Sequence, residues 1–209
     1  MQGIKPPTGF LKAFKIRFGT TPSAYKKRID KHFVSYKEIK MNQPKIVQRD
    51  EVSVIFTREL GNYNKSSDVA WKRLSHDLNT LEKKFKKNPP SFDLMLTEKN
   101  SETLGICHDD PQVTNENNIR YDAAISWGEK EVSELTKYGF ETKKVSGGKY
   151  AMVDYKGDTN AEEAWYGLYV WVEENGYSFR DEPAFEKYTN AWTNKDTSNL
   201  HTEVYVPIE

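Results

Sequence analysis

The pattern of apolar and polar positions along the chain repeats itself, and it predicts two similar units. Each unit opens with an extended apolar run, 52–57 or 150–155, which turns at a glycine. A segment with apolar residues three and four apart follows, as in a helix with one buried face. These two helices are marked by Trp71 and Trp165. Extended segments come after each helix, so both units read strand, helix, strand, strand.

The extended segments after the helices complete the two units. In chain order they cover 93–96, 103–107, 120–127, 184–188 and 202–208. Several of them mix polar and apolar residues as in a sheet with one buried face, and a short helix over 129–138 links the units. The pattern predicts an α+β fold of duplicated strand-helix-strand-strand halves with pseudo-twofold symmetry, in which helices pack on antiparallel sheets. A duplicated unit leaves a groove at its own interface, where small molecules commonly bind.

The first part of the chain follows another pattern. Aromatic rings recur every four residues, on one face of a helix, at Phe10, Phe14 and Phe18. Gly19 suits the left-handed position after a helix, and Thr21 with Pro22 is a typical start of the next one. A second, basic helix is expected to run from Pro22 into the cluster at 26–28.

This stretch, 10–28, resembles the C-terminal end of the AraC-type helix-turn-helix DNA-binding domain. That family carries two helix-turn-helix units, of which only the last part is present, so we expect that the chain does not read DNA by itself. The resemblance implies that residues 1–44 form a remnant of such a domain with a linker. The cationic residues of this remnant are Lys15, Arg17, Lys26, Lys27 and Arg28.

Charge divides the chain at the same place. The formal net charge is zero, but residues 1–45 hold 11 Lys and Arg against 2 Asp and Glu, and the rest hold 20 against 29. A basic segment on an acidic body suggests a part that faces nucleic acid and a module with another task, although a solvated lysine-rich helical pair fits the same charges. The single cysteine, Cys107, fits a reducing compartment. With no membrane-spanning apolar run and no signal peptide, the chain is expected in the cytoplasm.

Six different short motifs follow one another along residues 45–209. They lie at 61–63, 105–111, 119–124, 147–150, 182–188 and 202–208. Together they resemble the GyrI-like effector-binding domain, and the resemblance covers 45–209. This family is commonly fused after an AraC-type DNA-binding domain, so the two resemblances support each other. They imply two domains, 1–44 and 45–209.

Glu186 is the first candidate for binding a ligand. If Phe185 and Lys187 face one side of the predicted strand, Glu186 shares the other side with Ala184 and Tyr188. A carboxylate beside aromatic faces can hold a cation or a lipophilic amine by charge attraction and cation–π contact. The resemblance also implies a glutamate in the pocket floor at this position. The alternative is a surface glutamate paired with a lysine.

Aromatic residues are the candidates for the pocket wall. They are Tyr63, Tyr121, Tyr150, Trp165 and Tyr188. Core packing is the alternative for each, and it suits Trp71 and Trp171 better because they lie in regular apolar helix stripes. Residues 107–110 offer metal-ligand atoms, but sequence neighbours cannot all converge on one ion, so no metal or cofactor is expected. No nucleophile elbow or phosphate-binding loop occurs, and no catalytic residue is assigned.

Three functions stay open from the sequence. The first is the effector-sensing domain of an AraC-family transcriptional regulator, which binds an aromatic or cationic amphiphile between its repeats and so biases the DNA-binding half. DNA would be a partner only where the missing helix-turn-helix is supplied. The second is a hydrolase in which Glu186 is the general base for water. The third is a protein-binding module that contacts an enzyme such as DNA gyrase, as the family name suggests.

Overall fold

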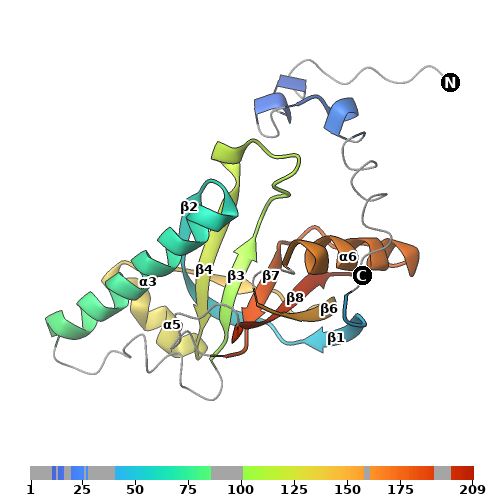
Figure 1. Ribbon diagram of the computed structural model, residues 1–209. Helices are drawn as coiled ribbons and strands as arrows, with labels where there is room; N and C mark the ends of the chain where they lie inside the picture. Colours follow the sequence, from blue (N-terminus) through green and yellow to red (C-terminus); the bar gives the residue numbers. More distant parts are fainter. Residues whose placement is uncertain are drawn as a thin grey trace.

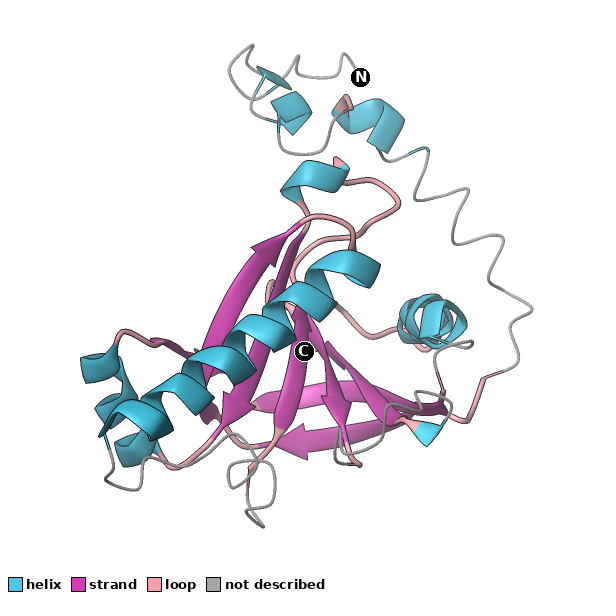
Figure 2. Ribbon diagram, turned by 60° about the vertical axis from the view of Figure 1, so that its left-hand side comes forward, coloured by secondary structure: helices cyan, strands magenta, loops and turns pink. Residues whose placement is uncertain are grey.

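Eight antiparallel strands form one curled sheet, and the helices α3 and α6 lie on it (Figures 1 and 2). The computed structural model describes residues 11–12, 14–16, 20–25, 27, 41–85, 101–157, 161–190 and 199–209. The strands are β1 (Lys45–Arg49), β2 (Val52–Leu60), β3 (Thr103–Cys107), β4 (Arg120–Ser126), β5 (Glu141–Val145), β6 (Gly148–Lys156), β7 (Ala184–Tyr188) and β8 (His201–Pro207). The helices are α3 (Tyr63–Phe85), α5 (Glu129–Leu135) and α6 (Ala161–Glu174), with 3-10 turns η1 (Glu116–Asn118) and η2 (Thr136–Tyr138).

The strand order shows the predicted duplication. Strands run across the sheet as β1-β6-β8-β7-β3-β4-β2-β5, so β7 and β3 meet at the centre and each half continues outwards in matching order. The first half is β2, α3, β3 and β4, and the second is β6, α6, β7 and β8. The duplicated α+β fold is therefore confirmed. The expectation of separate sheets is wrong, since the two halves share one continuous sheet in which β3 pairs directly with β7 at the symmetry axis.

Both long helices cover the same face of the sheet. Ala184 of β7 packs in the core beneath α6, and Tyr188, four positions along the same strand, packs against the core beneath α3. Alternate strand residues point to the same side, so these two contacts place α3 and α6 on one face. The opposite face has a core of its own, in which Phe185 stacks on Tyr205 with ring centroids 5.0 Å apart.

The outermost strands were not predicted from the sequence. Strands β1 and β5 have the sequences KIVQR and ETKKV, and within the described part of the chain they pair with β6 and β2 respectively, at the two edges of the sheet. Edge strands bury little apolar surface, so their sequences carry only a weak alternation. The linking helix ends as expected, since Gly139 follows η2 with a positive φ of 91°. The extended segment expected at 93–96 lies outside the described residues.

The part of the N-terminal segment that is described contains the expected helix start. The amide of Ala24 donates to the Thr21 hydroxyl at 3.3 Å, as an N-cap requires. This segment touches the body where the Asn118 side-chain amide donates to the Ile16 carbonyl at 2.9 Å. Lys15 and Lys27 are exposed, whereas Arg17, Lys26 and Arg28 fall outside the described residues. Among the helices that the structure describes, none is both long enough and apolar enough to cross a bilayer.

Candidate functional site

Glu186 lies on the helix-covered face, between the two halves of the protein. On β7 it stands between Ala184, which packs under α6, and Tyr188, which packs against the α3 core. Phe185 points to the opposite face, as the strand alternation predicts. The Glu186 side chain is half-buried. The Glu186 carboxylate therefore lies at the seam of the protein, which is where the regions covered by α3 and α6 meet.

Three aromatic side chains donate hydrogen bonds to the Glu186 carboxylate. The Tyr155 hydroxyl and the Trp165 indole nitrogen both reach Oε1 at 2.8 Å. The Tyr188 hydroxyl reaches Oε2, also at 2.8 Å. The donors come from β6, α6 and β7, so the sheet and one helix together fix the carboxylate. Hydrogen bonds to an ionised acceptor are among the stronger ones, and these three hold a negative charge in a ring of aromatic groups.

A second set of hydrogen bonds continues from Tyr188 towards α3. The Trp71 indole donates to the Tyr121 hydroxyl at 2.9 Å, and the hydroxyls of Tyr121 and Tyr188 are 3.1 Å apart. An indole N–H can only donate, and the Tyr188 hydrogen already points to Glu186. The Tyr121 hydroxyl consequently donates to Tyr188. The chain of hydrogen bonds has one direction, from α3 to the carboxylate.

Gly105 makes the contact between the two tyrosines possible. It is the β3 residue directly paired with Glu186 across the central strands. A Cβ atom at this position would lie 2.5 Å from the Tyr121 hydroxyl oxygen and 2.6 Å from that of Tyr188. Any larger residue would push the two hydroxyls out of place.

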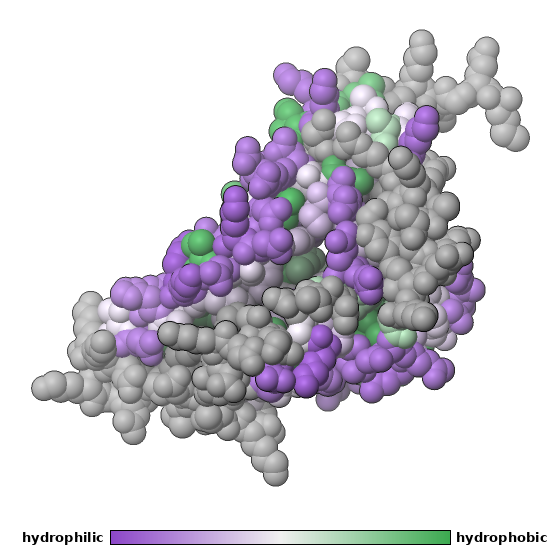
Figure 3. Space-filling view, viewed as in Figure 1, coloured by the Kyte–Doolittle hydropathy of each residue, from purple (hydrophilic) through white to green (hydrophobic). Residues whose placement is uncertain are grey.

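Further rings surround this group. Tyr63, at the start of α3, meets the Tyr121 ring edge-on with centroids 6.0 Å apart, and its hydroxyl donates to the Asp109 carbonyl at 2.6 Å. Tyr169 stacks on Trp165, with centroids 6.3 Å apart. Tyr63, Trp165 and Glu186 are all half-buried. Figure 3 shows a recess on this face, bordered by the polar side chains of α3.

The charge of Glu186 and the burial of its neighbours affect their protonation. Burial, together with the Glu186 charge, raises the pKa of Tyr155, Tyr188 and Tyr121 far above the usual value for tyrosine. These hydroxyls stay protonated and keep donating. The same two causes raise the pKa of the Cys107 thiol, so it is not a thiolate nucleophile at neutral pH.

Tyr150 does not belong to this group, contrary to the sequence-based expectation. Its ring packs on Phe185 with centroids 5.5 Å apart, in the core of the opposite face, and its hydroxyl donates to the Ser146 carbonyl at 2.7 Å. The tyrosine of β6 that reaches Glu186 is Tyr155, which sequence analysis did not select. The two lie five residues apart, and an odd spacing along a strand puts side chains on opposite faces. Counting from the apolar Ala151 and Val153 would have identified Tyr155.

The structure brings together the other residues that the sequence suggested for the site. Glu186, Tyr188 and Trp165 are joined by direct hydrogen bonds, and Tyr121 joins them through Tyr188. Trp71, which was assigned to the core, is buried as expected, but it also donates to Tyr121. That second role depends on tertiary contact and has no signal in the local sequence.

An ion cluster occupies the opposite face of β4. The fully buried Asp122 accepts hydrogen bonds from Arg58 at 2.6 Å, from His108 at 2.7 Å, and from Lys143. Burial alone would raise the pKa of Asp122, but these three donors outweigh it and lower the pKa strongly. Asp109 pairs instead with Arg120. Within the described part of the chain, no three His, Cys, Asp or Glu residues gather in a way that could hold a metal ion.

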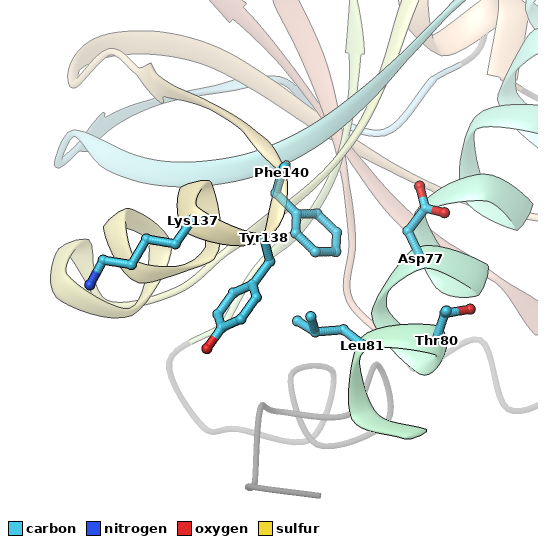
Figure 4. A pocket seen from close by; sticks show the side chains of 7 residues that line it. Asp77, Thr80, Leu81, Lys137, Tyr138 and Phe140 are labelled. Atoms are coloured by element: carbon cyan, nitrogen blue, oxygen red, sulfur yellow. The ribbon is translucent and has the colours of Figure 1, made fainter. Parts of the chain in front are cut away.

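A separate cavity of about 480 Å³ lies between the C-terminal part of α3 and the α5–η2 segment (Figure 4). Its lining residues are Asp77, Thr80, Leu81, Lys137, Tyr138, Gly139 and Phe140. Leu81 is ten residues beyond Trp71, or about 15 Å along the helix. In Figure 4, Lys137 points away from the apolar side chains of Leu81 and Phe140. We place the candidate site at Glu186, because three hydrogen bonds from aromatic side chains converge there.

The duplicated sheet with two helices on one face is the fold of a class of small-molecule-binding domain. The family model described as the GyrI-like small molecule binding domain matches residues 42–209, and the chain belongs to this family. The relatives include "Probable transcriptional regulator YgiV" of Escherichia coli K12, 29% identical over 110 residues, which are 52% of this chain and 68% of that protein. "SPbeta prophage-derived putative transcriptional regulator YosT" of Bacillus subtilis 168 is 34% identical over 113 residues, 53% of this chain and 70% of that protein.

Solved structures share the fold. The EcmrR C-terminal domain matches with a TM-score of 0.54 and 18% identity, over 80% of this chain and 97% of that domain. EcmrR in a complex with DNA matches with a TM-score of 0.60 and 18% identity, over 90% of this chain but only 66% of EcmrR. A hydrolase from Listeria innocua matches with a TM-score of 0.53 and 10% identity, over 87% of this chain and 98% of that protein. At these identities the likeness concerns the fold alone.

Proposed function

We propose that this protein senses aromatic or cationic amphiphilic small molecules, which bind over Glu186 between α3 and α6. The observation that carries the proposal is the half-buried carboxylate at the seam of the two halves, held by three aromatic donors. Membership of a small-molecule-binding family and relatives named as transcriptional regulators agree with it.

The polarity of the site favours a cation. Tyr155, Trp165 and Tyr188 direct their donor hydrogens at Glu186. The charge that remains to attract a ligand is the negative charge of the Glu186 carboxylate. Attraction between opposite charges is stronger at a half-buried site than at the surface, because the local dielectric constant is lower. The faces of nearby rings add cation–π attraction for the same kind of ligand. An anion would meet repulsion from the Glu186 carboxylate, to which the donors of Tyr155, Trp165 and Tyr188 are already directed.

The turn between β3 and β4 offers a route from this site to the N-terminal segment. The Tyr166 hydroxyl of α6 donates to Asp110 at 3.0 Å, and Tyr63 of α3 is hydrogen-bonded to Asp109. At the end of the same turn, Asn118 contacts Ile16. A ligand that moves α6 relative to α3 would alter this turn and thereby bias the N-terminal segment. We propose that the segment is the tail of an AraC-type DNA-binding domain, that such a regulator acts on DNA in the cytoplasm, and that DNA binding needs the complete helix-turn-helix.

The alternative functions have less support. Glu186 as the general base of a hydrolase would have to bind water while it accepts three hydrogen bonds, and its described partners are rings without a second acid. A protein-binding role, for example with DNA gyrase, stays an alternative.

The proposal is tested by calorimetric titration with two probes of the same shape and opposite charge. Tetraphenylphosphonium, a bulky aromatic cation, is expected to bind, and tetraphenylborate, its anionic counterpart, is not. Glu186→Gln removes the charge and should weaken cation binding about tenfold or more. Glu131→Gln, an exposed carboxylate of α5, is the control and should bind like the parent protein. Equal binding of both ions, or an unchanged affinity in Glu186→Gln, would contradict the proposal.

A further inference from the structure

The hydrogen bonds around Glu186 differ between its two oxygens. Each oxygen of an ionised carboxylate can accept two hydrogen bonds. Oε1 accepts from Tyr155 and Trp165, so both of its positions are occupied. Among the described residues, only Tyr188 donates to Oε2. One acceptor position of Glu186 is therefore left for a ligand.

The neighbouring side chains Trp71, Tyr121 and Tyr188 cannot replace this acceptor position as the hydrogen-bond partner of a ligand. The hydrogen-bond direction runs from Trp71 through Tyr121 and Tyr188 to the carboxylate. The hydrogens of these groups are committed to each other or to Glu186, and the raised tyrosine pKa values keep them so. A ligand that approaches Oε2 meets one acceptor that bears a negative charge. The ligand therefore has to supply the donor hydrogen of this hydrogen bond.

We infer that the site selects cations that carry a single N–H, which are protonated tertiary amines, over quaternary cations of the same shape. This inference rests on the proposed function and narrows its ligand class. A protonated tertiary amine brings one positive charge and one hydrogen, which matches one charge and one open acceptor position. A quaternary ammonium brings the charge without the hydrogen and leaves the acceptor unsatisfied. A primary ammonium brings three hydrogens, and two of them lose their water on entering an aromatic recess.

A matched series of ligands tests this preference. The probes are 9-anthracenylmethyl-dimethylamine, which is protonated at pH 7, its quaternary trimethylammonium analogue, and the primary amine 9-anthracenylmethylamine. The first two carry the same ring and charge and differ by one N–H against one methyl group. Affinities are measured with the full chain by anthracene fluorescence. We expect the tertiary amine to bind about tenfold more tightly than the quaternary analogue, as one charge-assisted hydrogen bond would give.

A variant supplies the second readout. Tyr188→Phe removes the donor at Oε2 and keeps the ring, so two acceptor positions become open there. The primary amine should then gain affinity relative to the tertiary amine. Tyr177→Phe, on the exposed turn after α6, should leave the ratio unchanged.

The outcomes separate this inference from the function on which it rests. A tertiary amine preference in the parent protein, shifted towards the primary amine in Tyr188→Phe, supports the inference. Quaternary and tertiary probes that bind equally well, or a ratio that does not move in Tyr188→Phe, overturn it and leave cation sensing intact. If neither the anthracene cations nor tetraphenylphosphonium bind, the proposed function itself is wrong.

Discussion

Gly105 and Glu186 are paired residues on the two central strands, where the halves of the sheet meet. Over Gly105 the hydroxyls of Tyr121 and Tyr188 come within 3.1 Å of each other, and Tyr188 extends the contact to Glu186. The duplicated halves are thus chemically different at their common seam. The first half contributes Gly105, which has no side chain, and the second half contributes the Glu186 carboxylate. The aromatic network depends on both residues.

The first prediction concerns Gly105→Ala. The new Cβ would lie 2.5 Å from one tyrosine hydroxyl and 2.6 Å from the other, so both rings must shift. We expect a loss of about 2 kcal/mol in the free energy of unfolding, typical of overpacking, together with weaker binding of tetraphenylphosphonium. Denaturant unfolding and calorimetric titration measure the two effects.

Gly128→Ala is the matched control. There the added Cβ would meet only the end of the Glu131 side chain, which can move away. It should change neither stability nor binding. Gly105→Ala behaving in the same way would show that the tyrosine contact has no importance.

The second prediction uses the fluorescence of Trp165. Its indole nitrogen donates to Glu186 and its ring stacks on Tyr169, so a ligand at the site must change its surroundings. We expect binding of tetraphenylphosphonium to change the tryptophan emission, and Trp165→Phe to remove most of that change. Trp171 of the same helix stacks on Tyr177, beyond the site, and Trp171→Phe should keep it. A signal lost in Trp171→Phe instead would place the ligand elsewhere on α6.

The duplicated fold could be predicted because its central elements have strong patterns. Helix α3 buries Leu74 and Leu78 on one side, and the strands at the centre of the sheet are rich in apolar residues. The edge strands β1 and β5 have one free side and few buried residues, so their pattern is weak. The continuity of the sheet could not be foreseen, because the pairing of β3 with β7 joins segments about eighty residues apart, and such contacts have no local signal.

The candidate site was predicted in part for similar reasons. The face of Glu186 follows from strand alternation over five residues. The choice of Tyr150 over Tyr155 failed because residue type was considered without its position in the alternation. The hydrogen bond from Trp71 to Tyr121 links residues fifty positions apart, and only the tertiary structure reveals it.

The third prediction concerns pH and Asp122. Its pKa is lowered in the folded protein, so its contribution to stability is complete above the unfolded pKa, about 4, and is lost as the pH falls towards the folded value. The pKa of His108 is also lowered, first by burial, so protonation of the unfolded chain below about pH 6.5 adds to the loss. The free energy of unfolding should therefore decline from pH 7 to pH 3.

Asp122→Asn tests this assignment. The variant leaves Arg58 and Lys143 without their carboxylate partner, and we expect it to lose about 3 kcal/mol at pH 7. Its stability should depend less on pH below pH 5 than that of the parent protein. Parallel stability curves for the two proteins in that range would show that Asp122 is not the group that titrates.

The fourth prediction concerns the route to the N-terminal segment. If the Tyr166–Asp110 hydrogen bond transmits ligand binding, tetraphenylphosphonium should change amide hydrogen exchange within residues 20–25. Tyr166→Phe should bind the ligand with similar affinity but lose that change. Tyr177→Phe, on the exposed turn after α6, serves as the control. An undiminished change in Tyr166→Phe would exclude this hydrogen bond as the link.

The most direct test of the central claim is a crystal structure of the protein with tetraphenylphosphonium. We predict that the phosphonium lies against the Glu186 carboxylate between α3 and α6, with phenyl rings on Trp165 and Tyr63. Density for the ligand in the cavity beside Leu81 and Phe140, with the surroundings of Glu186 unchanged, would contradict the claim that Glu186 anchors the ligand.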